Sequence, residues 1–376
     1  MIDTDVVVGE ALKLTCARDE LVAKVAIVSR AVSSRTAVQI LAGILLRAEG
    51  GELQLAATDM ELSLRTSLGA SIDEEGSAVV PGRLLLDLAR LLPADDVQIT
   101  HRPQDGSVEI VCGTASYRLH TYAAEDFPRL PDVETASTFS VDSDVLLHTV
   151  AQVSRAASRD ESRPVLTGIL ARFEPDRLVM AATDGYRLSV KETALEGNTQ
   201  ELEAIIPARA LAELGRVAAD TGELELGVHE NQVVFRTADI VLTTRRIDGQ
   251  FPNYKQLLPE AFEHIVTLPR SELLDVVRRV SVMAQRNTPL RLRFAEGELR
   301  VSAQTQDVGE ASESLPAAWE GDAMEIGFNA EFLREGLESV ESDDLRLKLI
   351  SPLRPGLLQG EGAEFSYLIM PIRLAG

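Results

Sequence analysis

Apolar residues recur at helical spacing in three segments of the chain. In the first segment the apolar residues fall at a 4-3-4 spacing, which places them on one face of an α-helix predicted over residues 19–35. The spacing returns 125 residues later and again after a further 127 residues, predicting helices over 144–159 and 270–286. The three sets are Leu21, Val25, Val28 and Val32; Leu146, Val150, Val153 and Ala157; and Leu273, Val277, Val280 and Ala284.

A second helix follows in each segment. The strings "VVPGRLLLDLARLL" and "IIPARALAELGRVA" each carry a proline near the helix start, where its missing N–H costs nothing. The third string, "IGFNAEFLREGLESV", has Asn329 in place of the proline. These helices are predicted over 82–92, 208–219 and 329–340. For the first helix of the first and third segments, Asp19 and Ser271 are the predicted N-caps, because short polar side chains accept hydrogen bonds from the first turn.

Short alternating segments lie between and after these helices. "GELQLAATD", "DRLVMAATD" and "GELRVSAQT" alternate apolar and polar residues after a turn signal, as half-buried strands do. Two helices and several antiparallel strands in about 125 residues define an α+β unit, which the chain repeats three times. The predicted domains are 1–135, 136–260 and 261–376, and they leave no residues for a further domain.

Charge and cysteine content narrow the class of protein. The 376 residues carry 37 Lys and Arg against 59 Asp and Glu, a net charge of −22, which taken as a whole argues against nucleic-acid binding. Cys16 and Cys112 are the two cysteines, and no Cys/His cluster has zinc spacing, so buried inert thiols are predicted. No signal peptide or membrane span is recognisable, and a cytoplasmic protein is expected.

The polar motifs favour turns over catalysis. Thr58-Asp59 and Thr183-Asp184 each follow a predicted strand, where Thr and Asp side chains bond the backbone N–H groups of a bend. The alternative is a hydrolase that uses Asp59 or Asp184 as its acid. No nucleophile elbow, phosphate loop or dinucleotide fingerprint is present, and no metal spacing is found among the five histidines. We therefore expect no enzyme activity, cofactor or metal.

The predicted helices differ in charge from the rest of the chain. They hold 14 basic and 10 acidic residues, a net charge of +4, so the remaining residues carry −26. Two interpretations stay open at this point. The basic residues could reflect ordinary placement near helix ends, or they could line a surface that meets an anionic partner.

Four features together resemble the bacterial DNA sliding clamp, the beta subunit of DNA polymerase III. They are the threefold unit, the turn "TDGYRL", the linker "FPNYKQLLP" and the C-terminal "YLIMPIRL", in the order that the family has them over essentially the full chain. The sequence departs from the family in about ten extra N-terminal residues, in the proline-rich "SPLRPGLLQ", and in Tyr186, where many relatives carry His.

The resemblance implies a head-to-tail homodimer whose six domains close a ring with the helices toward the hole. Duplex DNA is then held without sequence specificity, and polymerase III alpha subunit, clamp loader, other polymerases and repair proteins bind through short peptides. The family's DNA-contacting positions correspond here to Lys24, Arg35, Arg83, Arg159, Arg163 and Arg209. Its dimer contacts correspond to Tyr117, Ser281 and Val282.

The resemblance also implies a peptide pocket between the second and third domains. Its residues are Leu166, Thr183, Gly185, Tyr186, Arg187, Leu188, Pro252, Leu257, Leu353, Met370, Pro371, Ile372 and Arg373. The first copy, "TDMELSLR", lacks the glycine and a neighbouring C-terminal strand, so we expect it not to bind the same peptides. The alternative function is an acidic repeat scaffold that binds proteins without encircling DNA.

Overall fold

The computed structural model describes residues 11–33, 37–93, 95–130, 138–195, 201–219, 221–229, 231–285, 288–306 and 308–374. The chain forms two compact units, the first made of residues 1–144 and 213–246 and the second of residues 145–212 and 247–376. The division falls inside helix α5 (Ala208–Val217), so the second repeat contributes to both units. No helix among the described residues is long and apolar enough to cross a membrane.

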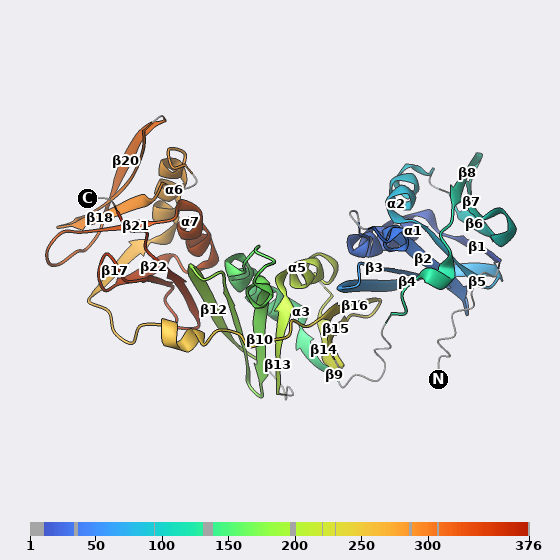
Figure 1. Cartoon of the computed structure of the whole chain (residues 1–376), viewed down its shortest axis with the longest axis horizontal. Coiled ribbons are helices and arrows are strands. Elements are labelled where there is room, and N and C mark those ends of the chain that lie inside the picture. The colour runs from blue at the N-terminus through green and yellow to red at the C-terminus, as the bar shows by residue number, and fades with distance from the viewer. Residues whose placement is uncertain are drawn as a thin grey trace. The chain divides into compact units, whose positions relative to one another are not determined.

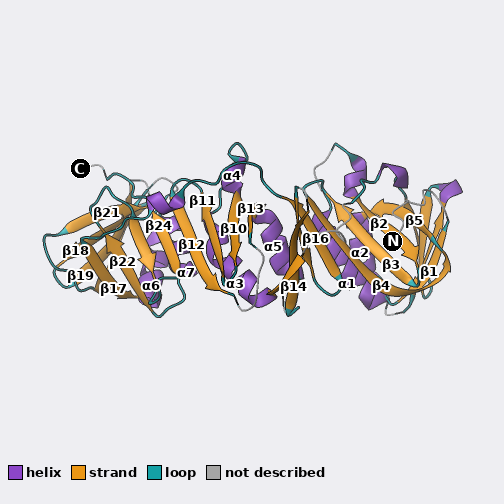
Figure 2. Ribbon diagram, turned by 90° about the horizontal axis from the view of Figure 1, so that it is seen from below, coloured by secondary structure: helices purple, strands orange, loops and turns teal. Residues whose placement is uncertain are grey.

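Unit 1 contains one antiparallel sheet. Its strand order is β8-β7-β6-β1-β4-β16-β15-β14-β9, and β3 pairs β4 while β2 pairs both β3 and β5. Its strands are β1 (Leu12–Cys16), β2 (Gly43–Glu49), β3 (Glu52–Thr58), β4 (Leu62–Glu74), β5 (Gly76–Pro81), β6 (Val97–Arg102), β7 (Ser107–Cys112), β8 (Ala115–His120), β9 (Thr138–Asp142), β14 (Glu223–His229), β15 (Gln232–Arg236) and β16 (Ile240–Arg245). Helices α1 (Arg18–Val28) and α2 (Gly82–Leu91) contact each other, and Figure 2 shows them behind β2, β3 and β4.

Unit 2 contains two antiparallel sheets, with orders β13-β10-β11-β12-β24-β23-β22-β17 and β20-β19-β18-β21. The strands are β10 (Gly168–Glu174), β11 (Arg177–Thr183), β12 (Arg187–Ala194), β13 (Leu202–Pro207), β17 (His264–Pro269), β18 (Leu290–Ala295), β19 (Glu298–Thr305), β20 (Gly309–Pro316), β21 (Met324–Phe328), β22 (Asp344–Leu349), β23 (Gly356–Gln359) and β24 (Phe365–Ile369). The helices are α3 (Ser143–Val153), the short α4 (Pro164–Thr167), α6 (Arg270–Ser281) and α7 (Ala330–Ser339), and α6 packs against α7 (Figure 1).

The helical faces predicted from the apolar spacing are the buried faces. Leu21, Val25 and Val28 of α1 are fully buried, and the first three residues of the sets in α3 and α6 are buried as well. The fourth residue of each set is only partly buried, because the regular helix ends before it at Val28, Val153 and Ser281. Short 3-10 turns, Ser29–Ala31 and Ser154–Ala156, follow α1 and α3.

The predicted caps of the first helices are wrong. The structure has Ala17 and Pro269 at the N-cap positions of α1 and α6, without a side-chain cap, so Asp19 and Ser271 lie inside the first turn. The apolar spacing identifies the buried face of a helix but not its first residue, and α1 and α6 each begin one residue before the predicted cap. Asn329 does cap α7, because its side-chain oxygen accepts a hydrogen bond from the Phe332 N–H at 3.0 Å.

Neighbouring repeats are joined edge to edge through their sheets. β16 of the second repeat pairs with β4 of the first, with Leu242 opposite Leu64. β24, at the end of the third repeat, pairs with β12 of the second, with Leu368 opposite Leu188. These pairings satisfy strand edges that would otherwise be exposed, and they place residues of different repeats in one continuous surface.

Both thiols are buried, as predicted, and we expect them to be unreactive in the folded protein. Cys16 and Cys112 are 4% and 1% exposed, and burial, with Asp96 and Glu20 nearby, raises the pKa of the Cys16 thiol to about 12. A buried, protonated thiol is a poor nucleophile. Titration with a thiol-reactive disulfide at pH 8 should detect no thiol in the native protein and both after unfolding. Rapid reaction of either thiol without unfolding would contradict this.

Candidate partner-binding site

The turn between β11 and β12 is built by the side chains of its own first two residues. The Thr183 hydroxyl donates to the Arg187 carbonyl at 2.6 Å and accepts from the Gly185 N–H at 3.1 Å. One carboxylate oxygen of Asp184 accepts from the N–H groups of Tyr186 and Arg187, at 2.8 and 3.1 Å. Gly185 has a φ of 93°, which favours glycine. These contacts confirm the prediction that the Thr-Asp pair stabilises a turn.

The first repeat has the same turn between β3 and β4. Thr58 bonds the Met60 N–H and the Leu62 carbonyl, and Asp59 accepts from the N–H groups of Glu61 and Leu62. Met60 adopts a φ of 78° where the second repeat has Gly185. The C-terminal strand β24 pairs β12 and not the first copy, as expected; β16 takes the corresponding place beside β4, and the Arg245 N–H donates to the Glu61 carbonyl at 3.0 Å.

A buried charge cluster anchors the second-repeat turn from inside. Arg187 is 8% exposed, and its guanidinium group contacts the Asp184 carboxylate at 3.1 Å, the Glu335 carboxylate of α7 and the Tyr367 hydroxyl at 3.3 Å. It also lies 4.2 Å from the centre of the Phe332 ring. Burial opposes the charge, but Tyr367 and Glu335 together raise the pKa of Arg187 above its ordinary value. Arg187, predicted as a pocket wall, therefore supports the turn from within.

Apolar residues of three segments meet beside this turn. Leu188 belongs to one core cluster with Phe251, Tyr254 and Leu368, and Val165 of α4 packs against that cluster. The predicted site residues Leu166, Pro252 and Leu257 are neighbours of these residues along the chain. Phe251, Tyr254 and Val165 were not among the predicted site residues; Phe251 and Tyr254 lie within the quoted linker "FPNYKQLLP", so the sequence already held a signal for them.

The C-terminal segment lies against the same turn. The Met370 N–H donates to the Tyr186 carbonyl at 2.9 Å, and the Ile372 N–H donates to the Gly327 carbonyl at 2.8 Å. Leu353 precedes β23, whose Gly356 pairs with Ile369, so it lies at the same end of the sheet as Met370. Pro371 is partly buried, and Arg373 is exposed. The contacts thus bring the turn and the C-terminal segment together.

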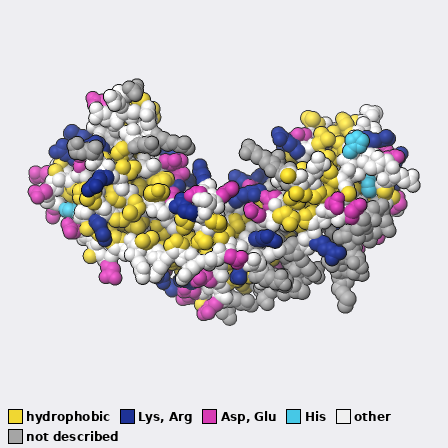
Figure 3. All heavy atoms as spheres, in the orientation of Figure 1, with side chains coloured by type: hydrophobic (Ala, Val, Ile, Leu, Met, Phe, Trp, Pro, Cys, Tyr) yellow, Lys and Arg dark blue, Asp and Glu magenta, His cyan; other side chains and the backbone are white. Residues whose placement is uncertain are grey.

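Several large apolar side chains stay exposed around this turn. Tyr186, Met370, Leu257 and Leu353 are 62%, 44%, 50% and 61% exposed. On the face of unit 2 seen in Figure 3, hydrophobic side chains also gather over β12 and β22. Exposed apolar side chains beside an ordered turn are typical of a surface that binds another protein. Among the described residues, no group of acidic, His or Cys side chains could hold a metal ion.

Arg163 contacts the turn as well. Its guanidinium group bonds the Asp160 carboxylate at 2.8 Å and the Asp184 carbonyl at 3.1 Å. The hydrogen bonds from Ser162 and Arg163 hold the pKa of Asp160 below its ordinary value. Arg163, predicted to contact DNA, therefore lies beside the candidate partner site, and its role toward DNA stays a prediction.

The other predicted DNA residues differ in their surroundings. Arg83 of α2, Arg159 after α3 and Arg209 of α5 are exposed. Lys24 of α1 is only 17% exposed at its side chain and pairs with Asp239. Arg35 lies outside the described residues. Basic residues of the helices also form ion pairs: Arg155 and Arg278 share Glu338 of helix α7, and Arg279 binds Glu313 of β20 at 2.7 Å. Several of the basic residues that the count includes are thus already held by carboxylates.

The predicted dimer residues lie at two sheet edges. Tyr117 is 39% exposed on β8, which ends the sheet of unit 1. Ser281 and Val282 end α6, which packs against β20, and β20 ends the four-stranded sheet of unit 2. Val282 is 74% exposed. β8 and β20 are thus two of the strands that end a sheet, and each has one edge at which another chain could pair.

Three successive domains of one α+β design, with helices over antiparallel sheets, define a DNA sliding clamp fold. The models of the N-terminal, central and C-terminal domains of the DNA polymerase III beta subunit match residues 12–131, 140–253 and 255–373. The chain therefore belongs to the DNA polymerase III beta subunit family, the bacterial beta sliding clamps. Its function is that of a sliding clamp, a processivity subunit of the replicative polymerase without catalytic activity of its own.

Relatives and solved structures agree with this assignment. The beta sliding clamps of Streptomyces coelicolor and Synechococcus elongatus are each 36% identical, over 97% and 96% of this chain and the full length of each relative. The crystal structure of the Bacillus subtilis clamp has a TM-score of 0.92 at 26% identity, covering 97% of this chain and all of the other. The comparisons support the clamp over the acidic scaffold and the hydrolase.

Proposed function

We propose that two copies of the chain close head to tail into a ring that encircles duplex DNA. The edges of β8 and β20 support this proposal: β8 of one copy pairs with β20 of the other, and the contact repeats at the second junction. A head-to-tail contact of this kind gives a closed ring when the rotations from each copy to the next add up to a full turn. The domain boundaries after residues 135 and 260, and a cytoplasmic location beside the chromosome, belong to the same proposal.

Arg83, Arg159 and Arg209 are the best candidates for DNA contact. They are exposed arginines on or beside helices α2, α3 and α5, which are the elements that a clamp of this design turns toward the duplex. Contacts to phosphates hold the protein on DNA without reading its sequence, which sliding requires. Lys24 and Arg163, which form ion pairs with Asp239 and Asp160, are further candidates, and so is Arg35, which lies outside the described residues.

The turn Thr183–Leu188, with the exposed side chains around it, is proposed to bind short peptides of partner proteins. Candidate partners are the polymerase III alpha subunit, the clamp loader, other polymerases and repair proteins. A Pseudomonas aeruginosa clamp, 25% identical with a TM-score of 0.89, was solved with griselimycin bound. The buried Arg187 cluster supports the proposal, because it fixes the backbone against which a peptide would lie.

Replacing Tyr117 by aspartate should convert the dimer into a monomer. A buried carboxylate at the β8 edge would lose its water without gaining a partner, which costs several kcal/mol at each of the two contacts. Size-exclusion chromatography with light scattering should then give half the mass of the native protein. Arg177→Glu, an exposed change in unit 2, should remain dimeric. A dimeric Tyr117→Asp protein, or a monomeric native protein, would overturn the proposed ring.

A further inference from the structure

Unit 1 contains a pocket of about 400 Å³ that none of the predicted site residues lines. It lies on the face of the sheet that points away from α1 and α2. Strand β3 shows the alternation that creates this face: Leu53 and Leu55 are fully buried, whereas Gln54 is exposed and Ala56 lines the pocket with it. The pocket therefore opens on the outer surface of the sheet.

The floor of the pocket crosses four strands. Leu45 of β2 lies opposite Ala56 of β3, Ala56 lies opposite Arg65 of β4, and Arg65 lies opposite Val241 of β16. Because the side chains at paired positions point to the same face, these four form one row. The floor is thus apolar at both ends, with a guanidinium group between them.

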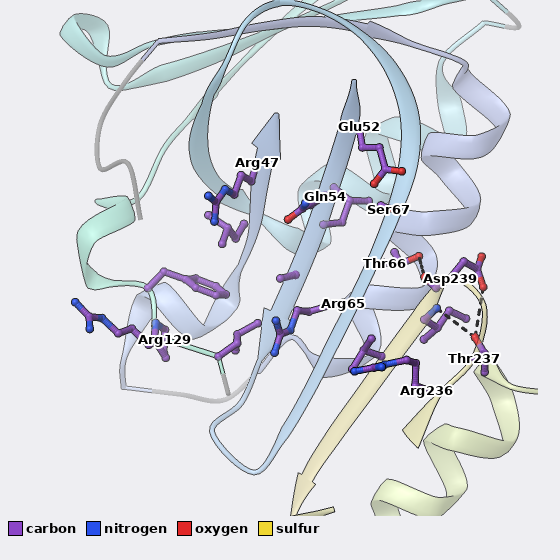
Figure 4. A pocket seen from close by; sticks show the side chains of 18 of the residues that line it. Arg47, Glu52, Gln54, Arg65, Thr66, Ser67, Arg129, Arg236, Thr237 and Asp239 are labelled. Atoms are coloured by element: carbon purple, nitrogen blue, oxygen red, sulfur yellow. Dashed lines mark hydrogen bonds between the residues drawn. The ribbon is translucent and has the colours of Figure 1, made fainter. Parts of the chain in front are cut away.

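Two segments form the walls. On one side the segment 124–130 carries Phe127, which is 8% exposed and packs into a core cluster with Ile40 and Val79. On the other side the turn between β15 and β16 is fixed by the Thr66 hydroxyl, which donates to the Asp239 carbonyl at 2.7 Å. Figure 4 shows Arg129 and Arg47 on one side of the pocket, Arg236 and Asp239 on the other, and Arg65 between them.

The lining is basic although the chain has a net charge of −22. Four arginines line the pocket, and the acidic side chains among its lining residues are Glu52 and Asp239. Asp239 is paired with Lys24, while Arg47 contacts the Glu49 carboxylate at 2.8 Å and Arg236 contacts the Glu225 carboxylate at 3.5 Å. The four arginines come from separate segments and are Arg47, Arg65, Arg129 and Arg236. Packing at this junction of the first two repeats therefore places four guanidinium groups around an apolar floor.

We propose that this pocket binds a short acidic peptide of a partner protein, in which carboxylates flank an apolar side chain. The guanidinium groups match carboxylates because each can donate two parallel hydrogen bonds. The row from Leu45 to Val241 takes the apolar side chain, and a volume of about 400 Å³ accommodates it with its neighbours. The site is separate from the turn at Thr183 and does not depend on ring closure.

The test is binding of an array of fluorescein-labelled pentapeptides with three acidic and two apolar residues, measured by fluorescence anisotropy on the full chain. Each peptide has a counterpart in which lysine replaces every acid. We expect saturable binding of acidic members, no saturation with the lysine counterparts, and affinity that falls as salt rises. Arg65→Glu and Arg236→Glu should each weaken the acidic peptides at least tenfold.

Control variants separate this site from the rest of the molecule. Arg177→Glu removes an exposed arginine of unit 2 and should leave the affinity within twofold of native. Gly185→Val, which alters the turn of unit 2, should also leave it unchanged. The proposal is overturned if no acidic peptide saturates at concentrations up to about 1 mM. It is equally overturned if both pocket variants, with native circular dichroism, bind as the native chain does.

Discussion

Replacing Gly185 by valine should weaken binding of a polymerase-derived clamp-binding peptide at least thirtyfold, about 2 kcal/mol. The φ of 93° at this position is strained for a β-branched residue, so the turn should shift and carry Tyr186 with it. Space is not the obstacle, because an added Cβ would meet its nearest atom, the Arg163 Nη1, at 3.5 Å. The measurement is a peptide titration by anisotropy or calorimetry.

Asparagine provides the matched control at this position. Gly185→Asn adds a side chain of similar size but tolerates the left-handed region, so its affinity should stay within about threefold of native. Both variants should remain dimeric, because the change lies in neither β8 nor β20. Native affinity in Gly185→Val would contradict the assignment of this turn to the peptide site.

Replacing Arg187 by methionine should destabilise unit 2 by about 3–5 kcal/mol, the largest effect on stability that we expect. The substitution leaves the Glu335 carboxylate, 14% exposed at its side chain, without its cation, and also removes a contact with Asp184. Differential scanning calorimetry should show the unit 2 transition several degrees lower. Peptide affinity should fall too, because the turn loses its internal support.

The double variant Arg187→Met with Glu335→Leu separates the charge from the packing. Removing both partners eliminates the uncompensated carboxylate, so at least half of the lost stability should return. A single variant that melts within one degree of the native protein would show that the cluster contributes little. Equal destabilisation in the single and double variants would mean that packing against Phe332, not charge, is what Arg187 supplies.

The repeated unit could be predicted from sequence because residues that are close together in the chain determine its helices and turns. The buried faces of α1, α3 and α6 follow from apolar spacing, and the turns at Thr58 and Thr183 follow from side chains that bond their own backbone. Helix starts were less predictable: the structure begins α1 at Arg18 and α6 at Arg270, each before the polar residue expected to cap it.

The features that could not be predicted depend on contacts between repeats. Nothing local in β16 indicates that it pairs with β4, yet this pairing creates the basic pocket of unit 1. The resemblance placed Arg187 in the pocket, but nothing near it in the sequence indicates its buried ion pair with Glu335, far along the chain. The ion pairs of Arg155 and Arg278 with Glu338 were not predictable for the same reason, because the partners lie in different helices.

Retention on closed DNA tests the central claim most directly. The chain is loaded onto nicked circular plasmid by a clamp loader, and its release is followed by gel filtration before and after a restriction enzyme linearises the circle. A ring held by enclosure should stay on the circle for many minutes and leave the linear form rapidly, with little dependence on salt while the circle is intact. Equal release from circular and linear DNA would contradict the account.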